Sequence, residues 1–346
     1  MRFYYFIIIY IVFFMSPFGL EIFARDRIRI AGSSTVFPYS KIIAENFSEY
    51  FPSFKTPLVE AGGSGSGIKE FCKGIGEDTI DVVNVSRRIT KYELNECKKN
   101  GVFDIQEIKI GYDGIALVSD TNMQSISLTI EDLYKALAAS LVVNGKLVSN
   151  PFHKWSDIRF DLPEVRIFIY IPSEKHGTRE VLEQKVLYEG CLRSGNFIKM
   201  RDDLKYNGLQ LNIACNSVRK DGLLVEVDGD YAETLARIEA NKNVFGFLGL
   251  SFYKNNSDIL KITAIDGIIP SMHTVSAGLY PIIRPLLFYV KKNHLRNVIG
   301  LREYIYFSVS DEMMNTSSQL IRYGLIPISE GERKAVRDSI AINKND

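Results

Sequence analysis

Three short turns in this sequence carry the side chains that a protein uses to hold an oxyanion. Residues 33–35 read Ser-Ser-Thr, residues 64–67 read Ser-Gly-Ser-Gly, and residues 176–178 read His-Gly-Thr. Each turn lies between a strand-like segment and the start of a helix-like segment. Helix N-termini carry unpaired N–H groups and partial positive charge, glycine lets a ligand approach the backbone, and hydroxyls add donors. We therefore predict that the three turns converge on one tetrahedral anion.

Two arginines stand beside such turns, Arg87 after an apolar run and Arg179 directly after the third turn. A guanidinium can donate two parallel hydrogen bonds to an oxyanion, so either side chain is a candidate cation. Both features also have ordinary structural explanations, because a Ser or Thr before a helix is commonly an N-cap and an arginine is commonly a surface charge. Three such turns in one chain favour the binding interpretation.

The same segments lack the spacing of known catalytic motifs. Neither Ser64 nor Ser66 has the flanking glycines of a Gly-x-Ser-x-Gly nucleophile elbow. Residues 62–67 have the glycine spacing of a P-loop, but Ile68 follows where a lysine is required. No zinc-peptidase or calcium-loop pattern is present, so we expect a binding protein without cofactor or metal rather than an enzyme.

The order of elements is typical of an α/β sheet that binds ligands at the carboxyl ends of its strands. Strand-like patterns occupy residues 27–31, 56–60, 80–85, 165–171, 244–250 and 285–290, with an extended crossing segment at 111–118. Helix-like patterns occupy residues 38–50, 68–73, 128–139, the stretch from the third turn to about 188, 231–240 and 308–323. Because no linker separates two domains, we expect the chain to cross between lobes more than once.

Length and charge narrow the class of protein. At ~150 residues per domain, 346 residues suggest two domains. The composition, 46% hydrophobic and 24% charged, is that of a folded globular protein. With 42 Lys and Arg against 41 Asp and Glu, the formal net charge is +1, so no overall field attracts nucleic acid or a membrane. Recognition of an anion must therefore be local.

The first 24 residues have the order of a secretory leader. Arg2 precedes an apolar run over residues 3–15, and Pro17, Gly19 and Ala24 follow. A cleaved signal peptide has this order, whereas a membrane anchor needs ~20 apolar residues. We expect cleavage after Ala24 and export of the mature chain, with an uncleaved anchor as the alternative.

Four cysteines follow the leader: Cys72, Cys97, Cys191 and Cys215. In an oxidising compartment an even count favours two disulfides over metal ligation, and the chain has no Cys-x-x-Cys pair. Three pairings are open. The sequence-local pairing joins Cys72 to Cys97 and Cys191 to Cys215, and it closes two loops of ~25 residues.

Taken together, the motifs resemble the PstS family, the periplasmic phosphate-binding proteins of bacterial phosphate ABC transporters. The matching segments are AGSSTVFP at 31–38, GGSGSGIK at 62–69, NVSRRI at 84–89, HGTRE at 176–180, VRKDG at 218–222, NVFGFLGLSFY at 243–253 and GLYPIIRPLLFYVK at 278–291. They occur in the expected order and span most of the chain after the leader. The Ser-Arg pair at 86–87 is similar to the Ser-Arg variant of the family.

The resemblance implies an α/β, type II-like, two-lobed periplasmic binding protein, in which each lobe is a mixed sheet flanked by helices and crossing strands form the hinge. It implies a signal peptide at 1–24, a first lobe at 25–111 and 269–346, and a second lobe at 112–268. It also implies a periplasmic monomer that captures inorganic phosphate and delivers it to the permease subunits of an ABC transporter. With the candidates beside the third turn included, the implied phosphate ligands are Ser34, Thr35, the Val36 N–H, Ser64, Ser86, Arg87, His176, Gly177, Thr178 and Arg179.

Two departures from the family pattern leave the identity of the anion open. Better-known members have Ser-Asp where this chain has Ser-Arg at 86–87, and that carboxylate accepts a proton from bound phosphate. Sulfate has no proton to donate and is rejected there, because it would leave a buried acceptor unpaired. Such members also carry an arginine just ahead of the third turn. That arginine is missing here, where the corresponding position is at about Pro172.

We expect Arg87 and Arg179 to supply the charge that these departures remove. Asp81 and Glu180 are the candidates to replace the acceptor carboxylate. Three alternative functions stay open on the sequence: binding of another oxyanion, such as sulfate or molybdate, a secreted phosphatase that uses the same anion-binding turns, and a phosphate sensor or surface adhesin held by an uncleaved leader.

Overall fold

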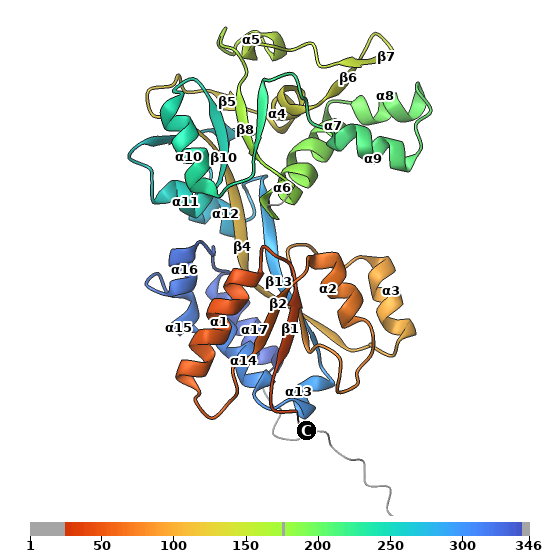
Figure 1. Cartoon of the computed structure of the whole chain (residues 1–346), viewed down its shortest axis with the longest axis vertical. Coiled ribbons are helices and arrows are strands. Elements are labelled where there is room, and N and C mark those ends of the chain that lie inside the picture. The colour runs from red at the N-terminus through yellow and green to blue at the C-terminus, as the bar shows by residue number, and fades with distance from the viewer. Residues whose placement is uncertain (1–24, 175–176, 341–346) are drawn as a thin grey trace, which may run out of the picture.

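Residues 25–174 and 177–340 are described by a computed structural model, and the predicted leader and His176 lie outside the described residues. The described chain forms two lobes, which stand one above the other in Figure 1. Two strands, β4 (Ile105–Asp120) and β13 (Ile283–Lys291), run between the lobes. The predicted α/β class with two lobes joined by crossing strands is confirmed.

In the described chain, one sheet of nine strands passes through both lobes in the order β2-β1-β3-β13-β4-β10-β8-β9, with β11 attached to β4. The long β4 pairs with β13 up to Gly114 and with β10 from Ile115, so the crossing between the lobes falls at this point. The other strands of the first lobe are mutually parallel: β1 (Arg29–Gly32), β2 (Leu58–Ala61) and β3 (Val82–Val85). In the second lobe, β4 is joined in the sheet by four further strands: β8 (Ile169–Pro172), β9 (Leu224–Val227), β10 (Phe245–Gly249) and β11 (Leu260–Ile262).

Helices cover both faces of the sheet in the first lobe. Val82 of β3 lies in the core under α1 and α14, whereas Val83 and Val85 lie in the core under α2 and α3. This alternation arises because successive side chains of a strand point to opposite faces of the sheet. The helices of this lobe are α1 (Phe37–Tyr50), α2 (Ser64–Phe71), α3 (Lys91–Lys99), α13 (His294–Asn297), α14 (Leu301–Ser308), α15 (Asp311–Met314), α16 (Gln319–Tyr323) and α17 (Glu330–Ile340).

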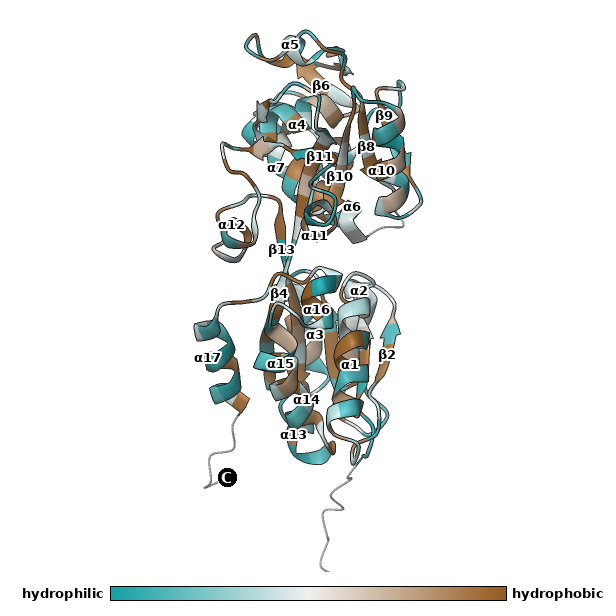
Figure 2. Cartoon of the chain, turned by 90° about the vertical axis from the view of Figure 1, so that its left-hand side faces the viewer, coloured by the Kyte–Doolittle hydropathy of each residue, from teal (hydrophilic) through white to brown (hydrophobic). Residues whose placement is uncertain are grey.

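The second lobe has a separate core that includes Trp155, whose ring packs edge-on against Phe245. Strands of both lobes carry the most hydrophobic residues in Figure 2. No helix within the described ranges is long and apolar enough to span a bilayer.

The helices of the second lobe are α4 (Ile130–Leu137), α5 (Trp155–Ile158), α6 (Gly177–Leu182), η1 (Glu183–Tyr188), α7 (Glu189–Arg193), α8 (Asn196–Asp202), α9 (Gly208–Asn216), α10 (Tyr231–Ala240), α11 (Leu250–Lys254) and α12 (Met272–Ser276). Two small strand pairs complete it: β5 (Ser127–Leu128) with β12 (Ala264–Ile265), and β6 (Ser140–Val143) with β7 (Lys146–Ser149).

Both predicted disulfides are present, in the sequence-local pairing. Cys72 at the end of α2 is bonded to Cys97 in α3, and Cys191 in α7 is bonded to Cys215 in α9. Each bond closes a short loop within one lobe, so neither restricts the movement of one lobe relative to the other.

The predicted boundary between residues 268 and 269 is wrong, because the following segment stays in the second lobe. Val275, Tyr280 and Ile282 are buried in the core of that lobe. The chain returns to the first lobe only at Ile283, where β13 begins. The segment joins the second lobe because its apolar residues pack in the core of that lobe. Its position after the last strand of the second lobe does not decide this.

The single helix predicted over 308–323 is also wrong, since two short helices replace it. Ser310 accepts a hydrogen bond from the Met313 N–H at 3.4 Å, and Ser318 accepts one from the Ile321 N–H at 3.3 Å. A serine that caps the helix after it has extended backbone and interrupts the helix before it. The two serines therefore start α15 and α16 separately.

Candidate functional site

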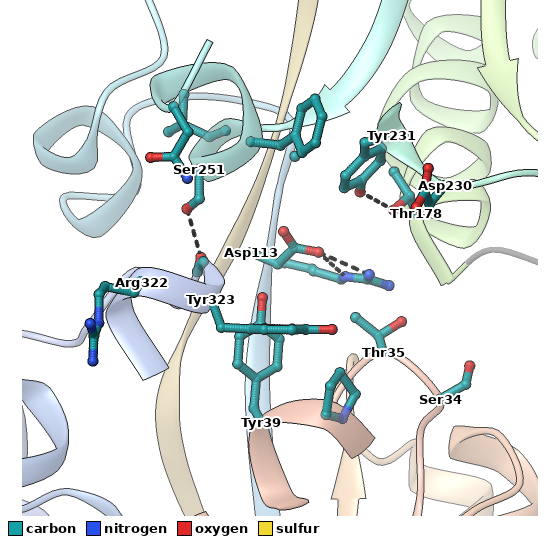
Figure 3. A pocket seen from close by; sticks show the side chains of 17 residues that line it. Ser34, Thr35, Tyr39, Asp113, Thr178, Asp230, Tyr231, Ser251, Arg322 and Tyr323 are labelled. Carbon is teal, nitrogen blue, oxygen red and sulfur yellow. Dashed lines mark hydrogen bonds and ion pairs between the residues drawn. The ribbon is translucent and has the colours of Figure 1, made fainter. Parts of the chain in front are cut away.

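A cavity of about 570 Å³ lies between the two lobes where β4 and β13 cross (Figure 3). The first lobe contributes residues from the turn after β1, from α1 and from the end of α16. The second lobe contributes the start of α6, the start of α10 and part of α11, and the crossing strands contribute one residue each. The polar lining consists of Ser34, Thr35, Tyr39, Asp113, Thr178, Asp230, Tyr231, Ser251, Asn255, Arg284, Arg322 and Tyr323.

The first predicted turn lies at the edge of this cavity. Gly32 ends β1 with a φ of +143°, a conformation that L side chains rarely adopt, and the chain then turns into α1. Ser33 is buried, and its Oγ accepts the N–H groups of Thr35 at 3.2 Å and Val36 at 3.4 Å. Ser34 and Thr35 line the cavity, so an anion there would compete with Ser33 for the backbone donors of this turn.

The second turn and the end of β3 meet the first turn in a cluster of serine hydroxyls. Ser86 Oγ lies 3.1 Å from Ser33 Oγ and 3.2 Å from Ser64 Oγ, and all three side chains are buried. A Cβ added to Gly67 would lie 2.4 Å from the Cα of Gly32, so only glycine lets α2 pack this closely on β1. Ser64 and Ser86 therefore lie together with Ser33, next to the residues that line the cavity, but do not line it themselves.

The third turn approaches from the second lobe. Gly177 begins α6, and the helix continues through η1 to the end of α7. Thr178 lies in the cavity wall, with its Oγ1 2.6 Å from the hydroxyl oxygen of Tyr231. Ser34 and Thr35 of one lobe thus share a cavity with Thr178 of the other (Figure 3).

Arg87 is not among the residues that line the cavity. Its guanidinium binds both carboxylate oxygens of Glu93, at 2.7 and 2.9 Å. Glu93 is also part of the capping box of α3, because it accepts the Thr90 N–H at 2.8 Å. The hydrogen bond from Arg87 lowers the pKa of Glu93 to about 2, and Glu93 in turn raises the pKa of Arg87. The local role of Arg87 is to hold the start of α3.

Arg179 is likewise occupied within its own lobe. It is 4% exposed and donates to Glu183 at 2.9 Å and to Glu226 at 2.7 Å. A third hydrogen bond, at 3.3 Å, goes to the carbonyl of Pro172. These contacts tie α6 to η1, β8 and β9, so the side chain points away from the cavity into the lobe.

The buried cation of the cavity is Arg284, which the sequence motifs did not single out. It lies in β13 directly opposite Asp113 in β4, at the crossing of the lobes. Its Nε and Nη2 donate to Asp113 Oδ2 at 3.1 and 2.9 Å, the contacts drawn as dashed lines in Figure 3. Arg284 is 4% exposed, so its charge acts in a medium where electrostatic interactions are stronger than in water.

Two tyrosines stand beside this ion pair. Burial raises the pKa values of Tyr39 and Tyr231 above the ordinary value, and the negative charge of Asp113 raises them further. Both phenols therefore stay protonated at neutral pH, and each keeps one hydroxyl hydrogen to donate.

The two candidate acceptor carboxylates lie in different places. Asp81 precedes β3 at the end opposite Ser86 and binds His294 Nδ1 at 2.6 Å and the Arg29 N–H at 2.7 Å, so it is not part of the site. Glu180 Oε2 lies 3.5 Å from Ser86 Oγ, a contact between the two lobes. No group of three His, Cys, Asp or Glu side chains in the described ranges is arranged to hold a metal ion.

We predict that acid removes the stabilisation that the Arg87–Glu93 pair supplies. The folded-state pKa of Glu93 is depressed from 4.5 to about 2, so the contribution is complete above pH 4.5 and declines as the pH falls toward about 2. Thermal unfolding of the wild type and of Glu93→Gln should differ at neutral pH and converge near about pH 2. A difference that stays constant with pH would contradict the assignment.

The crossing strands, the cavity between the lobes and the donors on both walls define a two-lobed solute-binding protein. Residues 22–312 match the family model described as a PBP superfamily domain, so the chain belongs to the PBP superfamily. It is similar to Protein SphX of Synechococcus elongatus, with 25% identity over 92% of this chain and 83% of that protein. It is also similar to the phosphate-binding protein PstS of Staphylococcus haemolyticus, with 24% identity over 81% of this chain and 76% of that protein.

Solved structures agree with these relatives. The crystal structure of a possible phosphate binding protein from Planctomyces limnophilus superimposes with a TM-score of 0.65 and 25% sequence identity, covering 92% of this chain and 98% of that one. The predicted resemblance to the PstS family is therefore confirmed.

Proposed function

We propose that this chain binds inorganic phosphate in the cavity between its lobes and passes it to the permease of an ABC transporter. One observation carries the proposal: Ser34 and Thr35 of the first lobe and Thr178 of the second face a cavity whose buried cation is Arg284. The relatives named PstS are phosphate-binding proteins, which supports phosphate as the anion.

The cavity offers the donors that a tetrahedral anion needs. The Ser34, Thr35 and Thr178 hydroxyls and the N–H groups at the starts of α1 and α6 are neutral donors, and Arg284 adds a guanidinium fork. Ser64 and Ser86 stand next to this set and complete it when the lobes approach. Because the donors come from both lobes, a hinge movement at Gly114 and Ile115 would close them around the anion.

We extend the proposal to the cellular location of the chain, its oligomeric state and whether it acts as an enzyme. Residues 1–24 direct export to the periplasm, where the mature chain acts as a monomer. We also propose binding without turnover, because the sequence motifs lack the spacing of the known catalytic motifs. A chromogenic phosphate ester tests this directly, since hydrolysis by the purified chain would favour a secreted phosphatase.

The test is calorimetric titration of the mature chain, stripped of endogenous ligand, with phosphate, then sulfate, then molybdate. We expect saturable phosphate binding at a ratio of one anion per chain, and Thr178→Val should weaken it without changing the melting temperature. Removal of one neutral donor to a charged ligand costs about 1.5–3 kcal/mol, or roughly ten- to a hundredfold in Kd. Tighter binding of sulfate or molybdate than of phosphate would assign the site to that anion instead.

A further inference from the structure

Tyr231 is held rigidly against Thr178 in the second lobe's wall of the cavity. It is the first residue of α10, directly after the N-cap Asp230. Its ring rests on Gly249, where an added Cβ would lie 3.0 Å from the ring, and its centroid is 5.6 Å from that of Phe252. Contacts with α6, the end of β10 and α11 therefore fix the phenol oxygen beside Thr178 (Figure 3).

The 2.6 Å separation of the two hydroxyl oxygens requires a hydrogen between them, and its direction decides what Thr178 can do. Each hydroxyl has a single hydrogen. If Thr178 donates to Tyr231, it has no hydrogen left for a ligand. If Tyr231 donates, the Thr178 hydrogen is free to point into the cavity.

Acidity favours donation by the tyrosine. A phenol, with an ordinary pKa of ~10, is a much stronger acid and donor than an aliphatic alcohol. The phenol also stays protonated, because burial raises the pKa of Tyr231. A hydrogen bond received by Thr178 polarises its own O–H group and makes it a better donor.

We infer that Tyr231 is a positioning residue, which donates its hydroxyl hydrogen to Thr178 Oγ1 and thereby makes Thr178 an obligatory donor to the bound anion. The inference rests on the proposed function for the identity of the anion. It has a consequence for the ligand: the oxygen that faces Thr178 must accept a hydrogen bond, so a hydrogen carried by monobasic or dibasic phosphate cannot point toward Thr178.

Binding tests the inference through a double-mutant cycle of Tyr231→Phe and Thr178→Val, with phosphate as the titrant. We expect Tyr231→Phe to weaken binding about five- to tenfold and to have no further effect in the Thr178→Val background. Tyr188→Phe is the matched control. Tyr188 lies in η1, farther along the continuous helix that contains Thr178, and its ring packs on Phe197. Unchanged or tighter binding by Tyr231→Phe would show that Thr178 donates to the tyrosine, and additive losses would show that the Tyr231 hydroxyl acts independently of Thr178; either result overturns the inference.

A second measurement does not depend on phosphate. The tyrosine Raman doublet distinguishes a phenol that donates a hydrogen bond from one that accepts, and the spectrum of the wild type minus that of Tyr231→Phe isolates this side chain in the ligand-free protein. A donor signature supports the inference even if the wild type fails to bind phosphate, which would count against the proposed function only. An acceptor signature overturns it.

Discussion

Arg284→Ala should abolish useful phosphate binding, the largest single effect that we expect in the cavity. The substitution removes the buried guanidinium and leaves the Asp113 carboxylate without this partner, facing the incoming anion. Truncating one member of a buried charged contact costs about 2–5 kcal/mol, which is a loss of at least thirtyfold in Kd. Calorimetric titration with phosphate measures it.

The matched control is Arg87→Ala. Arg87 precedes a helix that packs on the same lobe, but its guanidinium is bound to Glu93 and does not line the cavity. We expect its Kd for phosphate to equal that of the wild type. Arg284→Lys should give an intermediate affinity, because it keeps the charge but loses the planar fork.

Arg284→Ala could also unfold the region where the lobes cross, because it leaves the Asp113 carboxylate without Arg284. A second variant therefore separates the effect on folding from the effect on binding. Arg284→Ala combined with Asp113→Asn removes both charges and leaves no uncompensated carboxylate. We expect this double variant to melt near the wild-type temperature and still to bind phosphate weakly. Full binding by Arg284→Ala together with a loss in Arg87→Ala would mean that the anion lies beside α3 and that the cation predicted from the sequence is the right one.

The sequence predicted most of the fold because its strands and turns carry local signals. Alternating and apolar runs mark β1, β3, β8 and β10, and small residues mark the turns at their carboxyl ends. The error at the lobe boundary arose where no local signal decides the outcome. The segment after residue 268 joins the second lobe through Val275 and Tyr280, which are contacts with residues distant in the sequence.

The grouping of the serine hydroxyls could also be predicted from the sequence, because hydroxyls next to strand ends are brought together by the parallel order of the strands. The arginine that lines the cavity could not. Arg87 and Arg179 stand in the right turns, but each has a glutamate within a few residues that captures it, at Glu93 and Glu183. A carboxylate close in the sequence therefore holds each of these two arginines within its own lobe and outside the cavity lining.

A signal for Arg284 was nevertheless present. Asp113 interrupts one extended segment and Arg284 interrupts another, and both segments are otherwise rich in apolar residues. A charged side chain within a buried strand requires a partner, so opposite charges in the predicted crossing segment at 111–118 and directly before the predicted strand at 285–290 indicate a pair. Tyr231 had no such signal, because it stands at the start of an ordinary capped helix.

Asp81→Ala should destabilise the protein strongly and leave phosphate affinity unchanged. Asp81 is fully buried below the first lobe's sheet, where its carboxylate contacts Arg25, His294 and the backbone N–H of Arg29. Removing it leaves the buried His294 ring and the Arg25 side chain, which is 10% exposed, without this carboxylate. The loss of one partner from a buried ion pair costs about 3–5 kcal/mol of unfolding free energy. Lys291, whose pKa burial lowers to about 8, adds a further positive charge nearby when it is protonated.

Asp104→Ala is the control for Asp81→Ala, because it removes a carboxylate from an ion pair that is exposed rather than buried. Asp104 forms an ion pair with Lys292, the residue after Lys291, but both side chains are about half exposed, at 59% and 47%. Exposed pairs contribute at most about 1 kcal/mol, so this variant should unfold close to the wild-type temperature. Equal destabilisation by the two substitutions would show that the Asp81 cluster is no more than a surface ion pair. A weaker phosphate affinity in Asp81→Ala would instead mean that the far end of β3 is coupled to the cavity, which the separation of Asp81 from Ser86 along that strand argues against.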